Sequence, residues 1–305
     1  MAPHEQIAPI DGGALVNDGS HDTSGKVDGI RRPLRSWLFT PASRPDRFGK
    51  AAEVGADVLV LDLEDAVAPA DKEQARATAI GYLGRPPRGA VLRALRINGL
   101  DTRAGLADLH ALLGSSAAPD LLVLPKTDSA AHLHILDRLL TAARKDVRLV
   151  GIVESARGLL AVQETAAATP RLAALMFGAA DMAADLGATV AWEPLVSARC
   201  QLVAACARCG LLPIDSPFFD IHDKGGLSSE VTRSHALGFA SKAAIHPSQI
   251  GPINVALSPT PEAIARARAV LAENDKGVGV VDGQMVDEAI ARQARRTLAA
   301  AGLRA

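Results

Sequence analysis

The stretch VLVLDLEDAVAP, residues 58–69, shows in one place how this chain is built. Val58 to Leu61 are apolar, as in a strand covered on both faces. Asp62, Glu64 and Asp65 then follow within four residues. Burying unpaired charge is costly, so these carboxylates need positive partners nearby. The pattern therefore predicts a buried strand whose carboxyl end opens into a polar site.

Seven other short apolar runs follow the same design, and alanine-rich helical stretches separate most of them. The eight predicted strands are SWLFTPA (36–42), VLVLDLE (58–64), VLRALRIN (91–98), LLVLPK (121–126), LVGIVES (149–155), ALMFGAAD (174–181), LPIDSPF (212–218) and SKAAIHP (241–247). Strands that alternate with helices are typically parallel. Eight such units favour a closed (β/α)8 TIM barrel over an open doubly wound sheet. No G-x-G-x-x-G follows the first strand, which also argues against a dinucleotide-binding sheet.

Composition excludes several kinds of partner. The formal net charge is −1 and aromatic residues make up 3%, so neither a basic field nor stacking surfaces suggest nucleic acid. The chain has no run of eighteen apolar residues, so its sequence predicts no membrane span. We therefore expect small-molecule substrates, with no nucleic acid and no membrane.

The two ends of the chain differ from its middle. Residues 1–30 carry five acidic residues and no arginine, without the apolar core of a secretory signal, and 1–32 is predicted to be a flexible tail. The barrel is expected over 33–255. Two further helices over 256–305 would form a C-terminal extension or lid, joined by the glycine-rich DKGVGVVDGQM (275–285), which reads as a mobile or partner-seeking segment.

The three cysteines fit a reducing cytoplasm, where thiols stay free. Cys206 and Cys209 form a C-x-x-C, but it lies inside a helical pattern with no second pair nearby. Helix packing is therefore favoured over a metal or redox role.

Most predicted strands end in polar or special residues, which a barrel would gather on its C-terminal face, where such enzymes keep their chemistry. These residues are Arg44, Glu64, Asp65, Arg96, Lys126, Glu154, Asp181, Asp215 and His246.

Glu154 and Asp181 follow neighbouring strands, with no matching basic residue beside either in the sequence. Mg²⁺ prefers oxygen ligands and commonly uses one or two carboxylates, so we expect a Mg²⁺ site here, with Mn²⁺ as a possible substitute. Glu64 and Asp65 would contact the metal's waters. Salt bridges from these two carboxylates to Arg96 or Lys126 are the alternative, and both arrangements can coexist.

Arg96 suits a substrate that gathers negative charge, such as an enolate or carboxylate. Nucleophilic acyl transfer is poorly supported, because the chain has no G-x-S-x-G and no cysteine at a strand end. A Schiff base at Lys126 is disfavoured, because neighbouring carboxylates should keep this lysine charged.

Several motifs, in order along the chain, resemble the citrate lyase beta-subunit-like family of the HpcH/HpaI aldolase superfamily, which includes malyl-CoA and citramalyl-CoA lyases. The motifs are RSWLFTPASRPDRFGKAAEVGADVLVLDLEDAVAP, LRINGLDT, VLPKTDS, GIVESARGL, GAADMAADLG and IDSPFFDIHDKGG with AAIHPSQI. The resemblance implies a Mg²⁺-dependent carbon–carbon lyase that cleaves or forms a 3-hydroxyacyl-CoA thioester. Its partners would be an acyl-CoA and a keto acid such as glyoxylate, pyruvate or oxaloacetate. A homo-oligomer, a trimer or hexamer, is also implied.

Carried over by position, the resemblance makes Glu154 and Asp181 the metal ligands and Arg96 the group that binds the thioester oxygen. Glu64 and Asp65 would orient metal-bound water. Asp287, in DGQMVDEAI, matches a carboxylate of a C-terminal segment that closes over a neighbouring subunit, where it would be the general acid/base.

Besides Arg96, contacts to substrate are expected at Gly178, Arg47, Lys50 and His246, where the sequence signal is weaker. Gly178 opens the GAADMAADLG motif, and Arg47 and Lys50, with Arg44, could meet CoA phosphates as cations. A solvated helix face is an equal alternative for these three cations. His246 could line the thioester pocket or make a structural hydrogen bond.

Two other functions stay open from the sequence. The chain could be a subunit of a citrate lyase complex whose thioester sits on a carrier protein, or a metal-dependent aldolase of free keto acids.

Overall fold

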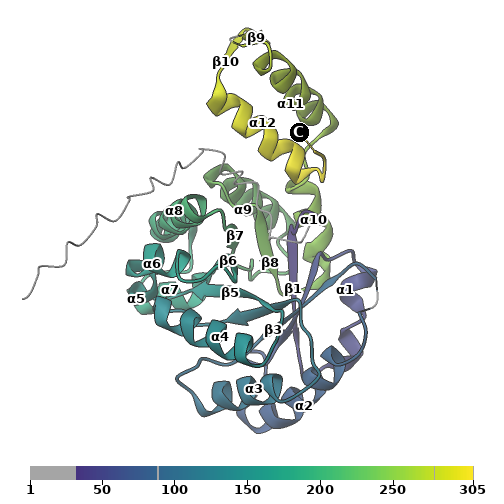
Figure 1. Ribbon diagram of the computed structural model, residues 1–305, viewed down its shortest axis with the longest axis vertical. Coiled ribbons are helices and arrows are strands. Elements are labelled where there is room, and N and C mark those ends of the chain that lie inside the picture. Colours follow the sequence, from purple (N-terminus) through teal and green to yellow (C-terminus); the bar gives the residue numbers. More distant parts are fainter. Residues whose placement is uncertain (1–31, 88, 278, 305) are drawn as a thin grey trace, which may run out of the picture.

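The eight predicted strands form one closed parallel barrel in the computed structural model, which describes residues 32–87, 89–277 and 279–304 (Figure 1). Neighbouring strands pair in chain order, and the last closes on the first. The strands are β1 (Ser36–Pro41), β2 (Val58–Asp62), β3 (Leu92–Arg96), β4 (Leu121–Leu124), β5 (Arg148–Val153), β6 (Leu172–Phe177), β7 (Leu212–Asp215) and β8 (Ser241–Ala244). The (β/α)8 barrel prediction is confirmed. Apart from Arg32, the predicted tail lies outside the described residues.

Helices cover the barrel and continue beyond it. They are α1 (Lys50–Glu53), α2 (Lys72–Leu83), α3 (Arg103–Leu113), α4 (Ala130–Ala142), α5 (Ala156–Leu160), α6 (Val162–Ala166), α7 (Ala179–Leu186), α8 (Trp192–Cys209), α9 (Lys224–Leu237), α10 (Ile250–Ala256), α11 (Pro261–Asn274) and α12 (Glu288–Ala300), with 3₁₀ turns η1 (Pro45–Arg47), η2 (Pro69–Asp71) and η3 (Pro247–Gln249). Across the described part of the chain, no helix has both the length and the apolar character that crossing a membrane requires.

Side chains that alternate along the strands form two apolar layers, one inside the barrel and one between the barrel and its helices. Side chains of one parity pack together inside the barrel: Trp37, Val58, Val60, Ala94, Leu121, Val123, Val150, Ile152, Ala174, Met176, Leu212, Ile214 and Ala243. Their neighbours of the other parity, such as Leu59, Leu61 and Leu95, join the helices in the outer layer. Because side chains alternate along a strand, Asp62, Arg96 and Glu154 continue the inward parity of Val60, Ala94 and Ile152. The interior thus changes from apolar to charged toward the carboxyl ends of the strands.

A separate C-terminal unit follows the barrel. It consists of α11, α12 and the strands β9 (Gly279–Val281) and β10 (Gln284–Val286), and its own small core includes Val270, Val286 and Leu298. Figure 1 shows this unit beyond α9 and α10 rather than over the barrel strands. It corresponds to the predicted C-terminal helical extension.

The glycine-rich link expected over 275–285 contains an antiparallel hairpin, with Met285 opposite Val280. Its two-residue turn is Asp282-Gly283, and both residues have positive φ, at 49° and 75°. Asp-Gly is favoured in such turns because each position requires a left-handed backbone. The Asp-Gly pair after Val280 and Val281 was therefore a readable hairpin signal.

Candidate active site at the barrel mouth

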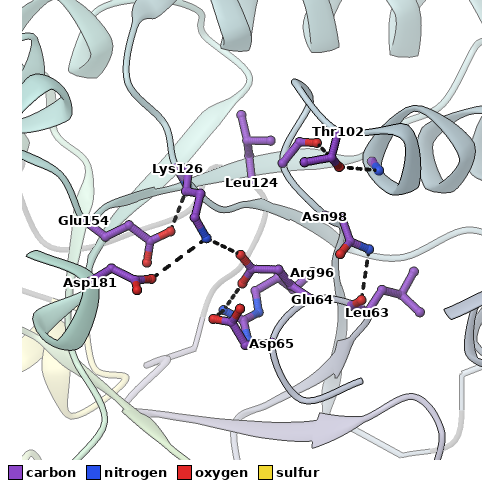
Figure 2. A network of polar contacts seen from close by, with 12 residues as sticks. Leu63, Glu64, Asp65, Arg96, Asn98, Thr102, Leu124, Lys126, Glu154 and Asp181 are labelled. Atoms are coloured by element: carbon purple, nitrogen blue, oxygen red, sulfur yellow. Dashed lines mark hydrogen bonds and ion pairs between the residues drawn. The ribbon is translucent and has the colours of Figure 1, made fainter. Parts of the chain in front are cut away.

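Five charged side chains meet where the strands β2 to β6 end, and Figure 2 shows them converging from separate elements. We call them the mouth cluster: Glu64, Arg96, Lys126, Glu154 and Asp181. Each follows or ends a different strand, as the sequence predicted. The barrel therefore assembles residues that lie far apart in the chain.

Arg96 supplies the positive partner that the opening stretch required. Its Nε and Nη2 each lie 2.7 Å from an oxygen of Asp62, and its Nη1 lies 2.6 Å from Glu64 Oε2. Burial alone would lower the pKa of Arg96, but Asp62 and then the acidic neighbours raise it. Asp65 is exposed and lies 4.0 Å from Arg96. The ion-pair alternative for these carboxylates is therefore present in the structure, most strongly at Glu64.

Glu154 is the most perturbed acid of the cluster. Burial raises its pKa to about 8, and the nearby carboxylates of Glu64 and Asp181 act in the same direction. The backbone N–H of Lys126 donates to its Oε1 at 2.8 Å. A nearby positive charge, such as a metal ion, would stabilise the ionised form of a buried acid that lies beside two other carboxylates.

Lys126 corrects one expectation from the sequence. Glu154 and Asp181 were expected to lack a basic neighbour, yet Lys126 Nζ lies 4.0 Å from Asp181 Oδ2 and 2.6 Å from Glu64 Oε1. The barrel brings β4 and β6 ends together, which local sequence could not reveal. Burial tends to lower the pKa of Lys126, but the hydrogen bond and charge of Glu64 raise it. This agrees with a charged lysine and does not suit a Schiff base, which needs a neutral amine.

Gly178 has a packing reason beside its predicted role in substrate binding. A β carbon here would lie 2.4 Å from Glu154 Cβ and 2.5 Å from Glu154 Oε2. Glycine thus lets the Glu154 side chain pass over the start of α7. A direct role of Gly178 in substrate binding stays a prediction.

The donor set of the mouth cluster fits Mg²⁺. Glu154 Oε1 is held by Lys126, and no described group hydrogen-bonds its Oε2. Asp181 is about half exposed, at 46% of its side-chain surface. No group of three histidine, cysteine or acidic side chains suited to a metal occurs among the described residues, but Mg²⁺ needs only one or two carboxylates with water and substrate.

The other predicted contacts are more peripheral. Arg44 pairs with Asp46 and Lys50 with Glu53 on an exposed surface, where Arg47 is also exposed. This is the arrangement of a solvated face, and binding of CoA phosphates by these cations stays a prediction.

His246 and Asp287 both cap helices. His246 Nδ1 lies 2.7 Å from Ser248 Oγ and accepts from the Ser248 N–H at the start of η3, which is the structural alternative named for this residue. Asp287 Oδ1 accepts from the Ile290 N–H at 2.9 Å at the start of α12. Within its own chain, Asp287 belongs to the C-terminal unit rather than to the mouth cluster (Figure 1).

The three cysteines are free thiols. Cys206 is buried in α8, and burial raises the pKa of its thiol, so it is unreactive as a thiolate. This supports the helix-packing interpretation of the C-x-x-C.

Asp215 was predicted to join the cluster on the C-terminal face, but it belongs instead to a second charged group between β7, β8 and the helices α8 and α9, which the sequence did not predict. Asp215, which is fully buried, accepts from Arg199 Nε at 2.9 Å and from Lys242 Nζ at 2.7 Å, and Lys242 also lies 2.7 Å from Glu230. We call these four residues the sealed cluster. A lysine inside the predicted strand SKAAIHP was the available signal, because a buried lysine requires an acidic partner.

This chain has the architecture of the (β/α)8 enzymes, a closed parallel barrel with a perturbed acid among charged groups at its mouth. A family model described as HpcH/HpaI aldolase/citrate lyase matches residues 35–247, and the chain belongs to this family. The predicted family is thus confirmed.

The matches to individual relatives cover almost the full lengths of those proteins. The chain is 39% identical over 292 residues to the L-malyl-CoA/beta-methylmalyl-CoA lyase of Rhodobacter capsulatus, covering 85% of this chain and 92% of the relative. It is 58% identical to RipC from Yersinia pestis, with a TM-score of 0.68 over 76% of this chain and 98% of that one. It is 36% identical to CitE from Mycobacterium tuberculosis, solved with magnesium, acetoacetate and coenzyme A, with a TM-score of 0.75 over 90% and 100% of the two chains.

Proposed function

We propose that this protein is a Mg²⁺-dependent carbon–carbon lyase that cleaves or forms a 3-hydroxyacyl-CoA thioester such as malyl-CoA, citramalyl-CoA or citryl-CoA. The observation that carries the proposal is Glu154, a buried acid with a raised pKa at a barrel mouth that Arg96 also lines. The malyl-CoA lyase relative and the CitE complex with magnesium and coenzyme A support it.

Glu154 and Asp181 would hold the metal, which when bound supplies a Lewis acid for the oxygen of the keto acid. Arg96 would stabilise the thioester enolate. Asp62 holds two of its nitrogens, so Nη1 is the donor directed to the rest of the cluster. A fixed guanidinium aimed at developing charge needs no reorganisation during the reaction.

In the cleavage direction, a base takes the proton of the 3-hydroxyl group. The C2–C3 bond then breaks, its electron pair moves into the thioester enolate, and the keto acid leaves. Protonation of the enolate gives acetyl-CoA. Glu64 and Asp65 would orient water and neighbouring groups, and Asp287 of another copy would be the general acid/base.

A second copy is part of this proposal. Asp287 caps α12 of the C-terminal unit, and Figure 1 shows α12 away from the strands of its own barrel. Its action at a mouth cluster would therefore require a homo-oligomer, a trimer or hexamer, in which this unit meets a neighbouring barrel. We also infer a cytoplasmic location, which the free cysteines support.

Turnover of defined thioesters tests the reaction. The protein, freed of metal with EDTA, is incubated with malyl-CoA, citramalyl-CoA or citryl-CoA, with and without added Mg²⁺. We expect Mg²⁺-dependent release of acetyl-CoA together with glyoxylate, pyruvate or oxaloacetate. Cleavage of free malate or citramalate instead would favour the aldolase of free acids, and turnover only on a carrier protein would favour the lyase subunit.

Complementation tests the shared site. Asp287→Asn should keep the helix cap, because Asn caps nearly as well as Asp, yet lose about 10²–10⁴-fold in rate. Inactive Asp287→Asn and inactive Glu154→Ala chains, unfolded and refolded together, should recover part of the activity through mixed sites. Absence of recovery in mixed oligomers verified by mass would refute the shared site.

A further inference from the structure

Lys126 has an unusual backbone for a residue with a β carbon. Its φ is +49°, and the other two described non-glycine residues with positive φ, Arg144 and Asp282, lie in turns outside the mouth cluster. The left-handed region is disfavoured for such residues and persists where the surroundings enforce it, often at functional sites.

This conformation lets one residue contact three carboxylates, as Figure 2 shows. The Lys126 N–H donates to Glu154 Oε1 at 2.8 Å. Its Nζ donates to Glu64 Oε1 at 2.6 Å and lies 4.0 Å from Asp181 Oδ2. The lysine therefore binds the proposed metal ligands from the backbone side and from the side-chain side.

The side chain is also less enclosed than that of Arg96. It is 46% exposed, whereas Arg96, the other cation of the mouth cluster, is 12% exposed and held in two bonds by Asp62. Of the two cations, Lys126 is thus the one whose position can adjust to the charge present at the site.

We propose that Lys126 is a positioning residue that serves as a tethered counter-ion for the mouth cluster in the metal-free protein and competes with Mg²⁺ for it. This inference rests on the Mg²⁺ site of the proposed function. An ammonium already 4.0 Å from Asp181 would repel a divalent cation bound to that carboxylate. The same ammonium keeps Glu64, Glu154 and Asp181 together when no metal is bound. The affinity for Mg²⁺ is accordingly lower than the carboxylates alone would give.

Two charge-removing variants test this while sparing the backbone. Lys126→Asn and Lys126→Gly both accept a positive φ, so the N–H can still meet Glu154. Lys126→Arg keeps the charge. Lys276→Met, which removes an exposed ion-paired lysine in the C-terminal region, is the matched control.

Isothermal titration calorimetry with MgCl₂ alone, at pH 9 and without substrate, measures the affinity for Mg²⁺. At that pH Glu154, with a pKa of about 8, is mostly ionised, while Lys126, whose pKa is raised, stays charged. We expect Lys126→Asn and Lys126→Gly to bind Mg²⁺ about tenfold more tightly than the wild type. The rise in Tm at saturating Mg²⁺ should also be larger in both. Lys126→Arg and Lys276→Met should match the wild type.

The outcomes separate the two proposals. Unchanged or weaker Mg²⁺ binding by both Asn and Gly variants, with normal binding by the wild type, would overturn the counter-ion role. A wild-type protein that binds no Mg²⁺ would instead contradict the proposed function. A purely structural lysine would lower stability without tightening metal binding.

Discussion

The mouth cluster and the sealed cluster are built from the same residue types on one barrel, the first inside its mouth and the second between strands and helices, yet their charges are compensated differently. In the sealed cluster, burial would raise the pKa of Asp215, but Lys242 and Arg199 outweigh it and lower the pKa. In the mouth cluster, burial wins at Glu154, and the pKa rises to about 8. Two cations already bond the carboxylate of Asp215, whereas Glu154, which accepts a bond from the Lys126 backbone, can also accept a metal ion or a proton.

The side chains of the two clusters also differ in their exposure to solvent. Arg199 and Lys242 have side chains 2% and 1% exposed, whereas Lys126 and Asp181 are each 46% exposed. Arg199 also stacks over the rings of Phe177 and Trp192. The comparison teaches that charge at a strand end is not by itself a sign of catalysis. A buried acid that its neighbours leave under-compensated, beside charged groups that solvent can reach, is the better indicator.

Glu154→Gln should produce the largest effect on function. We expect turnover to fall by more than about 10³-fold, because a charged ligand is replaced by a neutral amide. Turnover of a CoA thioester and Mg²⁺ titration measure the change. Near-normal activity in the variant would place the metal elsewhere.

The same variant should be more stable than the wild type at high pH. The folded pKa of Glu154 is above its unfolded value of 4.5, so the folded state holds a proton that the unfolded state loses. This group therefore reduces stability as pH rises from about 4.5 to about 8. In EDTA, Glu154→Gln should melt at a higher temperature than the wild type at pH 9 and at a similar one near pH 4.5. A lower Tm at pH 9 would contradict the raised pKa.

Asp215→Asn should act in the opposite way, through stability. It leaves Arg199 and Lys242 buried without their carboxylate, which costs about 3–5 kcal/mol. Because the folded pKa of Asp215 is lowered, its contribution is present at neutral pH and disappears as pH falls through that value. Urea unfolding at pH 7 measures the loss. A change of less than about 1 kcal/mol would mean that the sealed cluster is not a structural ion pair.

Arg96→Lys separates function from structure within the mouth cluster. Lysine keeps the charge but loses the planar fork that meets both oxygens of Asp62 while presenting Nη1. We expect a loss of about 10²-fold in kcat/KM with the fold retained. Circular dichroism and Tm are the controls, and a collapse of Tm together with activity would make Arg96 a structural residue.

Ser216→Ala should have the smallest effect. Its Oγ accepts from Arg199 Nη2 at 3.2 Å at the edge of the sealed cluster. We expect a stability loss of about 1 kcal/mol and unchanged turnover, because the cation keeps its bond to Asp215. A larger effect on activity than on Tm would connect the two clusters.

Local sequence was enough for the barrel and for most of the mouth cluster. Alternation of strand and helix predicts a parallel sheet, and eight units predict closure. The placement of Glu154 and Asp181 after neighbouring strands was also readable, because parallel strands end on one face. The Asp-Gly hairpin at 282–283 was equally local, but the glycine content of the surrounding segment obscured it.

Pairing between distant side chains required the tertiary structure. The sequence named Lys126 as one alternative partner for Glu64, which lies 62 positions away, but only the structure shows that its Nζ bonds that carboxylate. Asp215 was readable as a strand-end acid, but not as the partner of Lys242 in β8. Sequence determined which residues reach the carboxyl ends of the strands, because the inward parity of each strand is a local property. Only the closed barrel decided which charges compensate one another, because electrostatic energy depends on distance and burial rather than on position in the chain.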